Sequence, residues 1–220
     1  LKSPTGKQSF DASFSPDSKK IAFCNFSGKK WNIAVVNIDD TGFFILSDKY
    51  KTDLFCPTFS PDGNSILCQD MQNFIELDLK GNILQTIPLK SITGDKQIYF
   101  SSANKGYFVN GKKEILFDAD TQDFFETARE PISNIYLYSI ASKSLKNITD
   151  KNISSYDPFP TSDGKYILFS AYTKDDLSKS LNPQDMEPVI TSWIYIMKTD
   201  GSEKAKLLRG AYEPSASSVQ

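Results

Sequence analysis

The stretch Thr58–Cys68 reads TFSPDGNSILC, and it decides the fold because its pattern recurs along the chain. Three other segments repeat it: SFSPDSKKIAF (Ser13–Phe23), YFVNGKKEILF (Tyr107–Phe117) and FPTSDGKYILF (Phe159–Phe169). The residues at the turn of each copy are Asp17, Asp62, Asn110 and Asp163. They follow one another at intervals of about 50 residues, a period typical of repeat architectures.

A second marker lies just upstream of the turn and fixes the unit boundaries. It reads Phe10-Asp11-Ala12, Phe55-Cys56-Pro57, Tyr156-Asp157-Pro158 and Tyr212-Glu213-Pro214. We therefore predict units at residues 10–54, 55–100, 101–155 and 156–211, with a fifth unit starting at 212.

Each unit has the pattern of four short strands. Pro-Asp-Gly is turn chemistry, since Pro presets φ and Asp bonds the local backbone. In the second unit the turn is followed by β-rich runs at Ile66–Gln69, Asn73–Leu79 and Ile83–Ile87. Four short strands per unit at this period predict an all-β fold, a β-propeller of four-stranded blades. An all-β sandwich is the alternative, but it does not require the same turn at a regular period.

Composition excludes several functional classes. The 220 residues contain no histidine, which removes Ser-His-Asp catalysis and histidine-ligated zinc. The net charge is −2 and neither sign is gathered into a block, which disfavours nucleic acid as a partner. The longest apolar run, Trp193–Met197, is far too short for a transmembrane segment. The three cysteines, Cys24, Cys56 and Cys68, lack metal-ligand spacing and are expected to be buried.

With Ser-Pro-Asp-Gly, a β-rich strand, Asn-Ile-Tyr and the polar turn Thr199-Asp200-Gly201-Ser202, the units resemble the WD40-like PD40 repeat of TolB-like β-propellers. The resemblance covers nearly all of the chain and is weakest in the third unit, where Asn110-Gly111 replaces the usual turn. TolB-like propellers have six blades, whereas this chain contains four units and the start of a fifth. The resemblance therefore implies either a single propeller domain or a fragment of one. It also implies a periplasmic or otherwise extracytoplasmic location. The repeat is similar to the propellers of prolyl-oligopeptidase-like peptidases and of oligogalacturonate lyases, but this chain lacks a Gly-x-Ser-x-Gly motif and the metal-binding histidines.

Repeated residues are interpreted as structural. A carboxylate needed once for catalysis would not recur at the same turn, so Asp17, Asp62 and Asp163 are expected to be turn residues. The aromatic residues that flank the turns are expected to form the core between blades: Phe14, Phe23, Phe59, Phe117, Phe159 and Phe169.

The irregular connections are the candidate site. The connection between the second and third strands is short in the first two units but runs over residues 119–133 in the third and 173–192 in the fourth. Equivalent connections of neighbouring blades share a face, so these two are expected to lie side by side. Adjacent aromatics in a polar loop need something to cover them. The predicted binding residues are Asp123, Phe124, Phe125, Arg129, Glu130, Tyr172, Asp175, Asp176 and Trp193.

These connections are rich in acids: Asp118, Asp120, Asp123, Asp175, Asp176, Asp185 and Glu187. They lack the ordered spacing of a calcium loop, so we expect no metal and no other cofactor.

The leading hypothesis is a non-catalytic propeller that binds a protein or peptide partner through this face. The alternatives are a carbohydrate-binding module that stacks sugars on Trp31, Tyr172, Trp193 and the loop aromatics, or the accessory propeller of an enzyme whose catalytic domain lies elsewhere.

Overall fold

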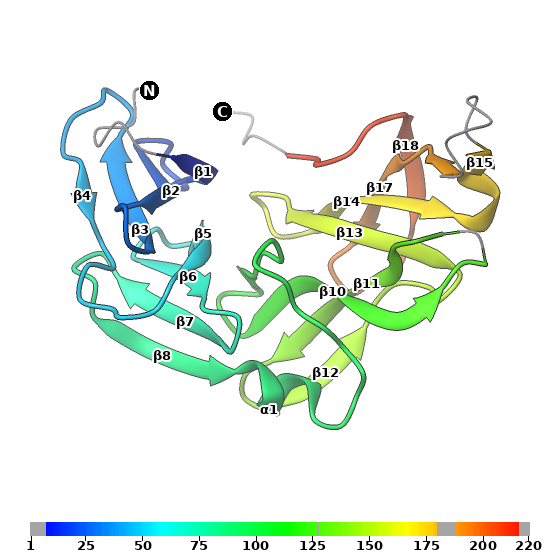
Figure 1. The fold of residues 1–220 in the computed structure, drawn as a ribbon, viewed down its shortest axis with the longest axis horizontal. Helices are drawn as coiled ribbons and strands as arrows, with labels where there is room; N and C mark the ends of the chain where they lie inside the picture. The colour runs from blue at the N-terminus through cyan, green and yellow to red at the C-terminus, as the bar shows by residue number, and fades with distance from the viewer. Residues whose placement is uncertain (1–7, 127, 180–187, 216–220) are drawn as a thin grey trace. The chain divides into compact units, whose positions relative to one another are not determined.

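The computed structural model describes residues 8–126, 128–179 and 188–215, and it is almost entirely β. The chain forms four four-stranded antiparallel sheets, the predicted blades, which confirms the fold class of a β-propeller (Figure 1). By contacts the chain divides into two compact units, residues 1–94 with 101–113 and residues 95–100 with 114–220.

The strands follow the repeat closely. The first blade contains β1 (Ser9–Phe14), β2 (Lys20–Phe26), β3 (Trp31–Asn37) and β4 (Phe44–Ile45). The second contains β5 (Phe55–Phe59), β6 (Ser65–Gln69), β7 (Asn73–Asp78) and β8 (Ile83–Pro88), followed by the five-residue helix α1 (Leu89–Thr93). The third contains β9 (Tyr107–Val109), β10 (Glu114–Phe124), β11 (Pro131–Ser139) and β12 (Ser144–Asn147). The fourth contains β13 (Ile153–Pro160), β14 (Tyr166–Thr173), β17 (Trp193–Lys198) and β18 (Ala205–Arg209).

The connection between β14 and β17 has structure of its own. A 3-10 turn, η1 (Lys174–Asp176), leads into a small two-stranded sheet of β15 (Leu177–Lys179) and β16 (Pro188–Ile190). Two of the acids noted in the sequence, Asp185 and Glu187, lie outside the described residues.

The repeated carboxylates are turn residues, as predicted. The Asp62 carboxylate accepts hydrogen bonds from the Ser60 hydroxyl at 2.5 Å and the Asn64 backbone N–H at 3.1 Å. Asp17 and Asp163 accept the equivalent bonds in their own blades. The hydroxyl bond is the largest cause of a lowered pKa at all three carboxyls. In the third blade, Asn110 and Gly111 have φ of 52° and 63°, the positive values that a type I′ hairpin turn requires.

The second marker has a structural cause that the sequence did not reveal. Asp11, Cys56 and Asp157 have φ of 62°, 55° and 50°, and each lies in an irregular register between the first two strands of its blade. The marker is therefore a β-bulge with a left-handed residue, which increases the local twist of the innermost strand.

The bulge also links successive blades. Within the first unit, the Cys56 backbone N–H donates to the Cys24 thiol on β2. At the start of the predicted fifth unit, Glu213 has φ of 54° and its backbone N–H donates to the Ser170 hydroxyl on β14 at 2.9 Å. Cys24 and Ser170 occupy the same position of the repeat. The 212–214 segment is thus bonded to the fourth blade as the second blade is bonded to the first.

The core of each unit lies on the second and third strands of the blades. In the first unit, Cys24 and Ile33 of one blade join Ile66 and Ile75 of the next in one buried cluster. In the second unit, Phe117 and Phe169 are fully buried.

The prediction that all the turn-flanking aromatics are core is wrong for Phe14, which is 64% exposed although the equivalent Phe59 is buried. Phe59 packs on the first blade, whereas the described residues of the same unit provide no equivalent neighbouring blade for Phe14.

Candidate loop surface

The connection in the third blade is shorter than the sequence indicated. We predicted a loop over residues 119–133, but β10 continues to Phe124 and β11 begins at Pro131, so only residues 125–130 connect the strands. Asp118 pairs with Ile135 and Asp120 with Ser133 in the extended ladder. The sequence is polar there because the hairpin extends past the core, and the side chains of β10 change from buried to exposed toward its end.

A small apolar cluster fixes the hairpin tip to the fourth blade. Phe125 and Tyr172 are both buried, and their rings meet edge to face with centroids 5.8 Å apart. Ile132 completes the buried part of the cluster, and Tyr156 and Leu177 pack against it. Phe125 and Tyr172 therefore support the surface from below, and neither is presented to a partner.

An ion pair joins the same two connections. Lys174 Nζ in η1 lies 2.8 Å from Glu126 Oε2 in the hairpin tip. The pairing lowers the pKa of Glu126 and raises the pKa of Lys174. Both side chains are exposed, so the pair contributes little to stability and acts mainly on position. The expectation that the two long connections lie side by side is correct for these described parts.

Asp176 and Trp193 form a hydrogen-bonded pair. The Asp176 carboxylate accepts hydrogen bonds from the Thr173 backbone N–H at 2.8 Å and from the Trp193 indole N–H at 3.0 Å. Burial opposes ionisation of Asp176, but these bonds outweigh it and keep its pKa low. This pair anchors the connection to β17. The Asp176 carboxylate and the Trp193 indole N–H are both engaged in these hydrogen bonds.

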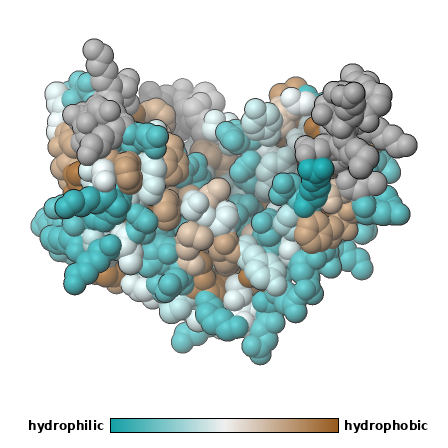
Figure 2. Space-filling model, in the orientation of Figure 1, coloured by the Kyte–Doolittle hydropathy of each residue, from teal (hydrophilic) through white to brown (hydrophobic). Residues whose placement is uncertain are grey.

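The remaining predicted residues form the exposed part, which we call the loop surface: Asp123, Phe124, Arg129, Glu130 and Asp175. Phe124 is 54% exposed, and Asp123, Arg129, Glu130 and Asp175 are also exposed. The loop surface thus offers one apolar side chain among charges that are mostly acidic. On the face drawn in Figure 2, apolar residues occur in several separate places.

The tryptophans are poorly placed to stack on a sugar. Lys206 Nζ lies 4.4 Å from the centre of the Trp193 ring, a cation–π contact that covers one face. Trp31 packs against Phe10 and Phe26, with ring centroids 4.6 and 5.0 Å apart. Tyr172 is buried.

Nucleophilic and metal-ligating groups are not gathered. Burial raises the pKa of Cys24 to about 12 and raises those of Cys56 and Cys68 further, which keeps the three thiols protonated. Within the described ranges, no three His, Cys, Asp or Glu residues are placed to hold a metal ion. In the same part of the chain no helix is long and apolar enough to cross a membrane.

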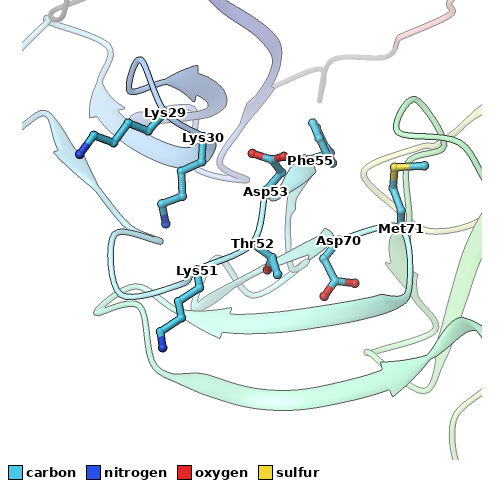
Figure 3. Close-up of a pocket in the computed structure, with 8 residues that line it drawn as sticks. All are labelled: Lys29, Lys30, Lys51, Thr52, Asp53, Phe55, Asp70 and Met71. Atoms are coloured by element: carbon cyan, nitrogen blue, oxygen red, sulfur yellow. The ribbon is translucent and has the colours of Figure 1, made fainter.

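Sequence reasoning missed a pocket in the first unit because its connections are short. A pocket of about 380 Å³ lies among the 27–30, 46–54 and 70–72 connections (Figure 3). The sequence feature that could have indicated this pocket is the recurrence of lysine in two of these connections, at Lys29, Lys30 and Lys51.

Comparisons with known proteins support the fold. No protein-family model and no curated protein sequence matches the chain. Among solved structures, the putative TolB from Agrobacterium tumefaciens superposes with a TM-score of 0.63 at 17% identity, over 93% of this chain and 68% of that one. TolB from Acinetobacter baumannii gives 0.56 at 20% identity, over 96% of this chain and 57% of that one. The β-propeller domain of the Trilobed protease from Pyrococcus furiosus, described as having an open velcro topology, gives 0.55 at 16% identity, over 90% and 57%.

At these identities the likeness concerns the fold alone. The four-stranded blades, the recurring turn of the repeat and these structural neighbours agree, and the chain has the fold of a TolB-like β-propeller.

Proposed function

We propose that this propeller is a non-catalytic binding module whose loop surface holds a peptide segment of a protein partner. The observation that carries the proposal is the contrast between two adjacent aromatics. Phe125 is buried against Tyr172 and fixes the hairpin tip, whereas Phe124 is 54% exposed at the end of β10. An exposed aromatic on a rigid support has little entropy to lose on binding and suits an interface anchor.

The charges around Phe124 indicate the chemistry of the partner. Asp123, Glu130 and Asp175 are exposed, and Lys174 is already paired with Glu126. An acidic rim favours a peptide that places basic residues beside an apolar one.

Three observations support a non-catalytic role. The sequence contains no histidine, the thiols are protonated by burial, and the repeated carboxylates are bonded in turns. By resemblance to TolB-like propellers we also place this function outside the cytoplasm, in the periplasm or an equivalent compartment.

The test is a peptide selection followed by quantitative binding. Peptides selected from a random display library on the wild-type protein are measured by fluorescence anisotropy. Phe124→Ala should weaken the selected peptides more than about tenfold, the effect of losing an aromatic anchor. Tyr166→Ala is the matched control, since Tyr166 is 38% exposed in the same unit but lies at the opposite end of β14. Unchanged binding by Phe124→Ala, or equal losses in the two variants, would refute the proposed surface.

A further inference from the structure

The pocket in the first unit is separate from the loop surface, and its walls differ in chemistry. Three connections and the start of β5 contribute its lining: Lys29, Lys30, Lys51, Thr52, Asp53, Phe55, Asp70 and Met71. In Figure 3 the three lysines lie on one side, Phe55 and Met71 on the other, and the two carboxylates between them.

The walls are held in place by bonds that occupy one lysine and both carboxylates. Lys30 Nζ donates to the backbone carbonyls of Ser47, Asp48 and Tyr50, which ties the 27–30 connection to the 46–54 connection. The Asp53 carboxylate accepts the Trp31 backbone N–H at 2.7 Å. The Asp70 carboxylate accepts backbone N–H groups of its own turn, from Gln72 at 3.0 Å and Asn73 at 2.7 Å.

The cationic wall is free to interact. Lys29 and Lys51 are exposed, and neither ammonium has a hydrogen-bond or ion-pair partner among the residues that the structure describes. With three lysines against two carboxylates, the lining has a net positive charge.

The apolar wall contains a side chain held in an unfavourable backbone conformation. Met71 has φ of 65° and is 50% exposed, and its backbone N–H donates to the Gln69 side-chain oxygen at 3.0 Å. A non-glycine residue pays for a left-handed conformation and persists only where its surroundings fix it. The thioether is adaptable and suits contact with varied apolar groups. Phe55 is half-buried on the same side of the pocket.

We propose that this pocket binds an acidic peptide segment, with a carboxylate directed toward Lys29 and Lys51 and an adjacent apolar side chain against Phe55 and Met71. A peptide fits better than a phosphate group. The pocket has no arginine fork for bidentate phosphate binding, and Asp53 and Asp70 repel a dianion more strongly than a single carboxylate. The inference is independent of the loop surface, which lies in the other unit and is acidic.

The experiment compares two labelled eight-residue peptides, one with a Glu-Leu-Asp-Phe centre and the other with Gln-Leu-Asn-Phe, by fluorescence anisotropy on the whole chain. The acidic peptide should bind, the neutral one should bind at least about tenfold more weakly, and added salt should weaken the acidic complex. The double variant Lys29→Glu/Lys51→Glu should lose the acidic peptide by more than about tenfold. The control Lys19→Glu/Lys80→Glu, which makes the same charge change at exposed lysines of β-turns in the same unit, should retain it.

A second variant tests the apolar wall without straining the turn. Met71→Gly keeps a residue that accepts positive φ and removes the thioether, so it should weaken the acidic peptide by about threefold to tenfold. Phe124→Ala should leave this peptide unaffected, which separates the pocket from the proposed loop surface. Equal affinity of the two peptides, equal losses in both lysine double variants, or displacement of the peptide by inorganic phosphate at lower concentrations than by acetate would overturn the proposal.

Discussion

At the scale of single residues, the turn aspartates have structural roles that can be measured. Asp62→Ala removes the acceptor of the Ser60 hydroxyl and the Asn64 backbone N–H, so it should lower the free energy of unfolding by about 1 kcal/mol at pH 7. The folded state lowers the pKa of Asp62 below its ordinary 3.8. Its contribution is therefore complete above pH 3.8 and declines as the pH falls through the lower folded value. Urea titrations of wild type and variant should diverge at pH 7 and converge in strong acid; an equal difference at both pH values would contradict this role.

Residue types predicted these turns because Pro, Asp and Gly have local preferences that do not depend on the rest of the fold. The conformations of the bulge residues cannot all be predicted from residue type in this way. Asp11 and Asp157 adopt positive φ, as Asp does more readily than most residues, but Cys56 has no such preference and takes the same conformation at φ 55°. Its backbone N–H bonds to Cys24 on the first blade, a contact that only the assembled first unit supplies.

At the scale of elements, the β10–β11 hairpin explains both the success and the error of the loop prediction. The sequence identified the right segment, because Phe124 and Phe125 are conspicuous among polar residues. It could not show which aromatic is buried, since both neighbours are equally apolar and only packing on Tyr172 distinguishes them. Nor could it show that the polar stretch from Asp118 to Asp123 belongs to strand β10, because a strand that extends beyond the core has no hydrophobic alternation.

This difference predicts opposite effects for adjacent substitutions. Phe125→Ala removes a buried ring from a peripheral cluster and should lower the free energy of unfolding by about 2 kcal/mol, below the range typical of central core phenylalanines. Phe124→Ala should change it by less than about 0.5 kcal/mol. Thermal denaturation of both variants measures this directly, and a larger loss for Phe124→Ala would mean that the two rings have exchanged roles in solution.

At the scale of the whole molecule, burial alternates across each blade in a way that predicts local stability. The second and third strands are buried on nearly every residue, as in β2, β3, β6 and β7. The outer strands are mostly exposed, and all five residues of β18 are. The repeat made this division predictable, because runs that are apolar on both faces mark central strands.

Hydrogen exchange should follow that division within each unit. Amides of β2, β3, β6, β7, β10, β11, β14 and β17 should exchange most slowly, because they open only when buried apolar contacts are lost. Amides of β4, β8, β12 and β18 should exchange faster, since one edge of each strand has no neighbouring strand in its sheet. Mass-spectrometric exchange on peptides covering single strands resolves the two classes. Uniform protection across the four strands of a blade would show that the outer strands are covered in solution. If β18 were covered, the edge of the fourth blade would become a candidate binding surface in place of the loop surface.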